Sequence, residues 1–214
     1  MTLKISPGNS KMGAIPSVSL PAGPTCRPDA PCYKQCYARR LERFRKTVHE
    51  SYVQNYELLK SDPETYWREA EAAVMMNRFF RFHVAGDIPD ADYFAHMVDI
   101  AKRNPHCEIL CFTKKYGIVN DYISEAWWKI DRGPSALPSD VPLPPNLHLI
   151  FSAWRGLPMQ NPWNLPEAHV VYRDGTTTAR EDAVPCGGNC TTCARTNGGC
   201  WSLKPGEQLT IHEH

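Results

Sequence analysis

The sequence lacks the features that usually mark a membrane or secreted protein. No apolar run in its 214 residues approaches the roughly 20 residues that a membrane-spanning helix needs. No charged and then apolar segment opens the chain, so we expect no signal peptide. Internal repeats and low-complexity tracts are also missing. These absences predict a cytoplasmic protein without a membrane partner, long enough for one good-sized domain.

Neither sign of charge is in excess, because 24 lysines and arginines against 23 aspartates and glutamates give a net charge of +1. Proteins that bind nucleic acid through its phosphates usually carry a clear basic excess. Nucleic acid is therefore a possible partner but not a favoured one, and the sequence identifies no other. The 42% hydrophobic content excludes disorder, although 19 prolines and 13 glycines predict many fixed loops.

Cysteine is abundant, and four of the nine cysteines lie in one run with the spacing C-x3-C-x2-C-x6-C: Cys186, Cys190, Cys193 and Cys200. An odd cysteine count without a secretion signal favours metal binding over disulfides. Zinc sites more often use separated C-x2-C pairs, whereas a tight run with a returning fourth cysteine is typical of an iron–sulfur cluster. We therefore expect a 4Fe–4S cluster here. Zinc, and a disulfide or free thiols, are the alternatives.

A second group, Cys26, Cys32 and Cys36, has the spacing C-x5-C-x3-C in a proline-rich segment with little apolar surface. Three thiolates suit a metal centre with one open position, or a centre completed from elsewhere in the chain. Packed structural cysteines are the alternative. The sequence thus predicts one cluster, allows a second, and leaves open whether both groups share a single centre. Cys107 and Cys111 are interpreted as core thiols.

The middle of the chain alternates between helix-like and strand-like patterns. Apolar spacing predicts helices over 38–60, from a Ser61–Glu64 capping box to about 77, from Asp90 to about 103, and over 120–131. Strands are predicted at 79–84, 108–112, 147–151 and 168–172, with a proline-rich connector at 134–145. Such alternation implies parallel pairing. We expect an α/β fold, a parallel-sheet partial (β/α) barrel with cysteine-rich N- and C-terminal loops, or else an open sheet.

The two cysteine groups lie on either side of this alternating region. We expect one domain over residues 1–214, made of an N-terminal cysteine loop at 1–37, an α/β core at 38–175 and a C-terminal cysteine-rich segment at 176–214.

Side chains at the carboxyl ends of parallel strands meet at one rim, where α/β sheets place their sites. The candidates for substrate contact follow the predicted strands: His83, Asp87, Lys114, Trp154 and Arg155. His83 and Arg81 alternate with phenylalanines, so both are expected to point away from the helices into the barrel, with a satisfied core histidine as the alternative. No residue can be assigned a catalytic role.

Four passages together resemble the phage gene product 88 family. They are Asn9–Met12 leading to Ser19–Cys26, the Cys32-x3-Cys36-Tyr-Ala38 motif, Arg81–Asp87 followed by Tyr93, and the terminal run from Cys186 to Cys200-Trp201. The resemblance spans nearly the whole chain. It implies a phage or prophage protein in a bacterial host, and it brings no activity with it.

A looser resemblance is to radical SAM proteins, whose partial barrel carries a 4Fe–4S cluster on three cysteines, typically C-x3-C-x2-C and often followed by Tyr-Ala. This chain divides those features, because Tyr37-Ala38 follows the N-terminal group while the C-x3-C-x2-C spacing begins at Cys186. In place of a Gly-Gly-Glu motif it has Ala85-Gly86-Asp87. The resemblance implies a radical-SAM-like architecture, whereas these departures argue against SAM as a cofactor.

Three functions are compatible with these patterns. The first is an iron–sulfur protein of that architecture, either a redox enzyme of unknown substrate or a descendant of one. The second is a non-catalytic module in which iron–sulfur or zinc only fixes the loops, and nucleic acid or another partner meets basic and aromatic side chains. Those side chains are Arg39, Arg40, Arg43, Trp154, Arg155 and Trp163. The third is a thiol redox sensor.

Overall fold

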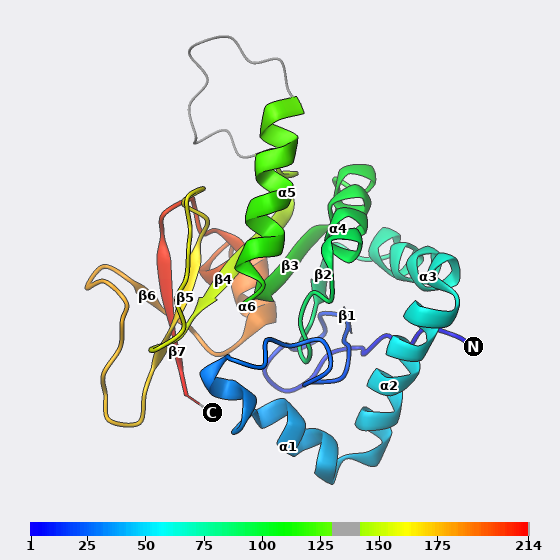
Figure 1. The fold of residues 1–214 in the computed structure, drawn as a ribbon, viewed down its shortest axis with the longest axis horizontal. Helices are drawn as coiled ribbons and strands as arrows, with labels where there is room; N and C mark the ends of the chain where they lie inside the picture. Colours follow the sequence, from blue (N-terminus) through cyan, green and yellow to red (C-terminus); the bar gives the residue numbers. More distant parts are fainter. Residues whose placement is uncertain (130–141, 214) are drawn as a thin grey trace.

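The computed structural model describes residues 1–129 and 142–213. Its centre is one seven-stranded sheet in the order β1-β2-β3-β4-β5-β7-β6, in which all neighbouring strands are parallel (Figure 1). The strands are β1 (Ser17–Val18), β2 (Phe79–Phe82), β3 (Glu108–Thr113), β4 (Leu147–Ala153), β5 (Glu167–Val171), β6 (Val184–Pro185) and β7 (Gln208–His212). The predicted parallel α/β fold is confirmed.

Three of these strands were not predicted, and they lie outside the range expected for the α/β core. β1 and β6 have two residues each, and each follows or contains a proline. β7 alternates polar and apolar residues and pairs with both β5 and β6. The N-terminal and C-terminal cysteine segments are therefore built into the same sheet as the core.

The helices are α1 (Tyr37–Phe44), α2 (Lys46–Ser61), α3 (Pro63–Met75), α4 (Ala91–Arg103), α5 (Tyr116–Lys129) and α6 (Cys190–Arg195), with short 3-10 turns η1 (Pro31–Tyr33) and η2 (Gly199–Trp201). The helix predicted over 38–60 is interrupted at Arg45. The end of the helix predicted over 120–131, and most of the connector at 134–145, lie outside the described residues. Among the described helices, none combines the length and apolar character that a bilayer-spanning segment requires.

Local capping explains where α3 and α4 begin. The predicted Ser61–Glu64 capping box is wrong, because Ser61 is the last residue of α2 and its hydroxyl bonds back to a carbonyl of that helix. Asp62 caps α3 instead by accepting the backbone N–H of Thr65 at 3.0 Å. Asp90 caps α4 as predicted.

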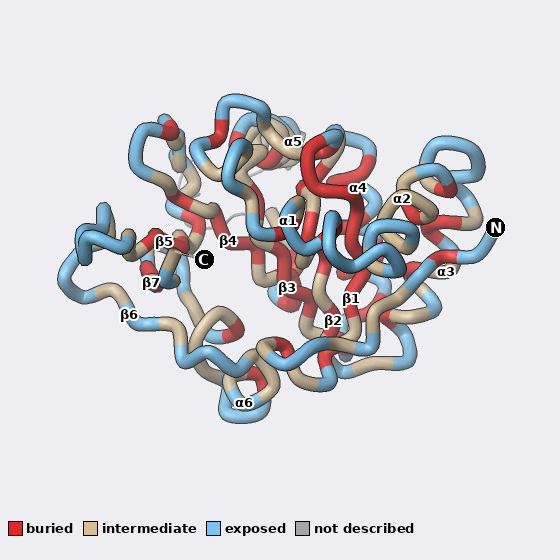
Figure 2. Tube along the Cα trace, turned by 90° about the horizontal axis from the view of Figure 1, so that it is seen from below, coloured by how far each residue is buried: buried red, intermediate tan, exposed pale blue. Residues whose placement is uncertain are grey.

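The two faces of the sheet carry different cores. One face packs Phe80 and Phe82 of β2 under α3, α4 and α5, and the predicted core thiols Cys107 and Cys111 are fully buried there. The other face holds Leu110 and the C-terminal segment around Trp201. Figure 2 shows the strands following an arc, with α6 on its open side. The sheet is thus a partial barrel whose inner face is filled by the cysteine-rich C-terminal segment.

Asn146 fixes the start of β4 to the end of α4. Its buried side-chain NH2 lies 2.8–3.0 Å from the carbonyl oxygens of Ala101, Asn104 and Cys107. We expect Asn146→Ala to lower the free energy of unfolding by about 3 kcal/mol, because it leaves buried acceptors without a donor. Urea denaturation measures this, with the exposed Lys102→Ala as a control that should change little. A loss below about 1 kcal/mol would contradict the assignment.

Candidate metal centre and adjoining cavity

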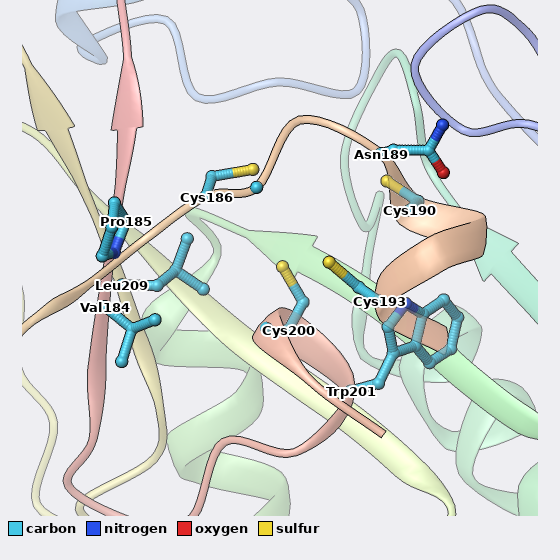
Figure 3. Close-up of a pocket in the computed structure, with 11 residues that line it drawn as sticks. Val184, Pro185, Cys186, Asn189, Cys190, Cys193, Cys200, Trp201 and Leu209 are labelled. Carbon is cyan, nitrogen blue, oxygen red and sulfur yellow. The ribbon is translucent and has the colours of Figure 1, made fainter. Parts of the chain in front are cut away.

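The C-terminal cysteines are positioned by separate elements. Cys186 follows β6, and its N–H donates to the carbonyl of Thr210 in β7 at 2.8 Å. Cys190 and Cys193 lie one turn apart on α6, and Cys200 lies in η2. Figure 3 shows the four sulfur atoms pointing towards a common space. The fold thereby brings together four cysteine side chains that come from different elements of the C-terminal segment.

The N-terminal segment holds α6 in position. The N–H of Cys190 donates to the carbonyl of Lys11 at 2.9 Å, and the Thr191 hydroxyl donates to the carbonyl of Met12 at 2.8 Å. On the other side, Trp201 is buried against the inner face of the sheet. The C-terminal cysteine-rich segment therefore lies between residues 11–12 and the inner face of the sheet.

All nine cysteines are free thiols. Burial raises the pKa of Cys200 to about 12, and neighbouring Cys186 adds to this, whereas Arg81 opposes it. Burial also raises the pKa of Cys190, again opposed by Arg81. Without a metal the Cys190 and Cys200 thiols are therefore protonated at neutral pH, and a bound metal would replace their protons.

The N-terminal cysteines form a second group in the loop that leads into α1. Cys32 lies in η1, and Cys36 is the residue that precedes α1. Burial raises the pKa of Cys26 to about 11, while the Gly23 N–H, which donates to its sulfur at 3.5 Å, opposes the rise. Burial raises the pKa of Cys32 as well, with Lys114 acting against it. An N–H aimed at sulfur and a nearby cation both favour a thiolate.

Both cysteine groups line one cavity of about 530 Å³ at the carboxyl ends of the strands: Cys26, Cys32, Cys36, Cys186, Cys190 and Cys200. Cys193 lines an adjoining pocket of about 20 Å³ together with the other three C-terminal cysteines. The small pocket has room for little more than one water molecule. A cluster on the C-terminal cysteines would therefore extend into the larger cavity.

Four of the five rim candidates line this cavity, namely His83, Asp87, Lys114 and Trp154. Arg155 is placed differently. Its guanidinium lies 4.3 Å from the centre of the Tyr172 ring and pairs with Asp174 at 3.6 Å. Tyr172, which directly follows β5, lines the cavity although it was not among the predicted rim residues.

Arg81 and His83 were both predicted to point to the inner face of the sheet, but β2 ends at Phe82, before His83. Arg81 points to the inner face, where its guanidinium lies 5.1 Å from the centre of the Phe112 ring. His83 has a φ of 60°, in the left-handed region, so its side chain leaves the alternation and packs against Tyr93. Only 3% of His83 is exposed, and burial lowers its pKa to about 3. It is a neutral imidazole in the cavity wall.

Asp87 joins the N-terminal cysteine loop to β3. Its carboxylate accepts the Thr113 hydroxyl at 2.6 Å and the Lys114 N–H at 2.9 Å, and its own N–H donates to Thr25 at 3.1 Å. Burial raises the pKa of Asp87, and Lys114 and these hydrogen bonds oppose the rise. The preceding Gly86 has a φ of 76°, and a Cβ there would lie 2.7 Å from the Leu20 carbonyl oxygen. Only glycine allows the loop to pass so closely.

The spacing of the side chains bears on which metal the cysteines fit. Within residues 1–129 and 142–213, no group of three or more His, Cys, Asp or Glu side chains is arranged to hold a metal ion. One tetrahedral zinc ion, with Zn–S bonds of about 2.3 Å, needs sulfurs about 3.8 Å apart. A 4Fe–4S cluster instead binds each of its thiolates through a different iron. The two kinds of centre therefore require different arrangements of the cysteines.

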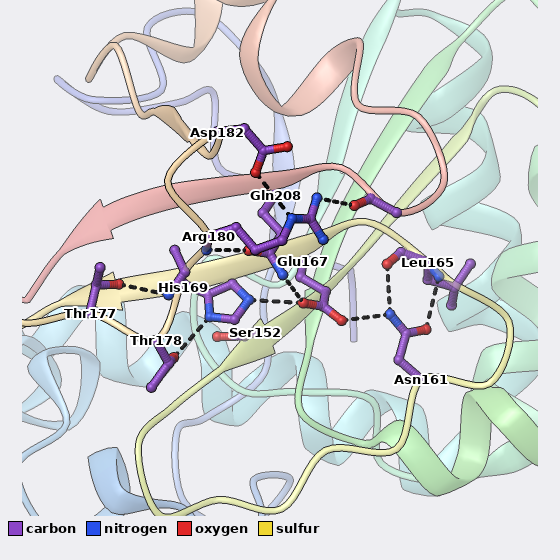
Figure 4. Close-up of polar contacts among 12 residues, drawn as sticks. Ser152, Asn161, Leu165, Glu167, His169, Thr177, Thr178, Arg180, Asp182 and Gln208 are labelled. Atoms are coloured by element: carbon purple, nitrogen blue, oxygen red, sulfur yellow. Dashed lines mark hydrogen bonds and ion pairs between the residues drawn. The ribbon is translucent and has the colours of Figure 1, made fainter.

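A polar network covers the outer face of β5, and the sequence analysis did not identify it. His169 bonds Glu167 and Thr178, each at 2.9 Å, while Glu167 also accepts from Asn161 at 2.8 Å and Gln208 at 2.7 Å (Figure 4). The hydrogen bond with His169 is the main cause that lowers the pKa of Glu167. These side chains satisfy one another's hydrogen bonds. The network therefore holds β5 against β7 and against the loop that follows β5.

Comparison with known proteins gives a family. Residues 3–202 match the family model "Gene product 88". The chain is 32% identical over 122 residues to the Gene 88 protein of Mycobacterium phage L5, covering 50% of this chain and 51% of that protein. It is 30% identical over 122 residues to the Gene 88 protein of Mycobacterium phage D29, covering 50% of each. The chain thus spans about half the length of the curated relatives it matches. No solved structure matches it.

Proposed function

This chain belongs to the Gene product 88 family of phage proteins, and from that premise and its converging cysteines we propose that it is an iron–sulfur protein. In this proposal Cys186, Cys190, Cys193 and Cys200 hold a 4Fe–4S cluster on the inner face of the partial barrel. The observation that carries it is the common orientation of the four sulfurs beside a large cavity (Figure 3). Such a cluster would supply one-electron transfer.

The N-terminal cysteines are included as a second centre. Cys26, Cys32 and Cys36 lie in a loop with few apolar residues, and metal binding would contribute folding free energy there. Three thiolates leave one iron position open or filled by another group. SAM is not part of the proposal, because the C-x3-C-x2-C run lies in the C-terminal segment against the barrel's inner face.

A thiol redox sensor is disfavoured by the pKa values of the buried cysteines. Sensor cysteines are accessible and have a lowered pKa. Burial instead raises the pKa of Cys26 to about 11 and that of Cys200 to about 12. Both thiols are therefore poorly suited to reaction with oxidants.

The nucleic-acid module is disfavoured by where its candidate side chains lie. Trp154 and Arg39 line the cavity, whereas Arg40 and Arg43 are exposed on α1. Trp163 packs against Trp127, with 5.5 Å between ring centres, and Arg155 is held by Tyr172 and Asp174. These side chains do not form the continuous basic and aromatic groove that single-stranded nucleic acid requires.

Anaerobic purification followed by metal analysis tests the proposal. We expect iron and acid-labile sulfide in equal amounts, and absorption near ~400 nm from thiolate-bound iron–sulfur clusters. Zinc without iron, or a colourless protein with neither metal after reconstitution with iron and sulfide, would overturn it. Zinc is measured in the same samples, so the two metals are compared directly.

A further inference from the structure

The cavity between the cysteine groups carries cations and a buried carboxylate, Asp87, which interacts with Lys114. Arg39, Arg81 and Lys114 line it, and each lies over an aromatic ring, of Tyr33, Phe112 and Trp154 respectively, at 5.0–5.5 Å from the ring centre. In the part of the chain that the structure describes, none of the three forms an ion pair. A cation on an aromatic ring stays available to an anion on its other side.

Buried polar atoms in the wall also lack partners. Within the described residues Nε of Arg81 has no hydrogen-bond partner, and the buried ring of His83 has no polar contact beyond the backbone of Ala85. Both side chains line the cavity. A buried donor or acceptor without a partner is destabilising, so a ligand that bonds to these atoms would relieve that penalty.

The size of the cavity and its apolar surface narrow the ligand class. A volume of about 530 Å³ lies within the range of small-molecule sites. Trp154, Tyr172 and Phe112 contribute aromatic rings to the same wall as the cations. A simple inorganic anion would leave these rings without a contact, whereas a planar ring system carrying an acidic group would use both.

We propose that the cavity binds an amphipathic anion, a planar aromatic or heteroaromatic molecule bearing a carboxylate, phosphate or sulfonate. Arg81 and Lys114 bind the acidic group, and Trp154 stacks on the rings. The inference rests on the proposed function in one respect, since a ligand held between the two cysteine groups is the candidate substrate of the metal centres. Arg81 and Lys114 also lie near the cysteines, but the aromatic wall has no role in holding a cluster.

Calorimetric titration with two matched probes tests this. Anilinonaphthalene sulfonate carries two ring systems and one sulfonate, and N-phenylnaphthylamine is the same molecule without the charge. We expect the anionic probe to bind one per chain and at least about tenfold more tightly than the neutral one. Arg81→Met and Lys114→Met should each weaken the anionic probe about tenfold and leave the neutral probe within about threefold.

Control variants separate this charge effect from misfolding. Arg81→Lys keeps the charge and should retain anion binding within about threefold, and Arg43→Met on exposed α1 should change neither probe. Equal affinity for both probes, or anion binding that Arg81→Met and Lys114→Met leave unchanged, would overturn the inference. Iron is measured in every sample. Absence of iron would refute the cluster proposal whatever the probes do. Loss of selectivity for the anionic probe with iron present would refute only the proposal of an anion-binding cavity.

Discussion

Replacing any one of Cys186, Cys190, Cys193 or Cys200 by serine is expected to remove about four irons per chain, the content of one cubane. The four sulfurs face a common space and come from α6, η2 and the residue after β6, so each is expected to supply one of the four ligands of the cluster. A serine hydroxyl is a harder and less acidic ligand than a thiol. Iron analysis and the absorption near ~400 nm measure the loss, because that band arises from the cluster.

Cys107→Ala is the matched control for these variants. Cys107 is fully buried in the other core, on the helix-covered side of the sheet, and lines neither pocket. Its replacement should lower stability by about 1–2 kcal/mol through lost packing while the iron content stays the same. Unchanged iron and an unchanged spectrum in all four serine variants would show that these cysteines hold no cluster.

The sequence predicted the fold well where apolar periodicity is strong. Phe80 and Phe82 alternate with Arg81, and the structure places the phenylalanines under the helices and the arginine on the inner face. Periodicity fails for short elements, because two residues such as Ser17–Val18 cannot show a repeat. These short strands form only because longer neighbours supply their hydrogen-bond partners.

The sequence indicated which residue types gather at the strand ends, but it was a weaker guide to where each side chain points. Lys114 and Trp154 follow β3 and β4 directly and line the cavity, whereas Arg155, one residue further on, points elsewhere. His83 departs from its strand through a positive φ, which no spacing rule indicates for histidine. Sequence spacing also could not show that the N- and C-terminal cysteine groups line one cavity, because that depends on β1 and β6 lying at opposite edges of one sheet.

Serine at Cys26, Cys32 and Cys36 together should reduce the iron content from about eight per chain to about four, since each cubane contains four irons. Charge interactions connect the cysteines within each group. Cys36 contributes to raising the pKa values of Cys26 and Cys32, after burial, just as the other C-terminal cysteines do for Cys200. The two-centre prediction requires such interactions within each group.

The rival arrangement is one cluster shared across the cavity, which both groups line. Arg81 lines the same cavity, and it opposes the rise in pKa both of Tyr37, next to the N-terminal group, and of Cys200. A shared centre would give about four irons in the unaltered protein and none after mutation of either group, because one cubane cannot survive the loss of half its ligands. Two centres give about eight irons, and each triple or quadruple variant keeps about four. Iron content in the unaltered chain and in both variants therefore decides between them, and a count of four lost by either variant would overturn the two-centre prediction.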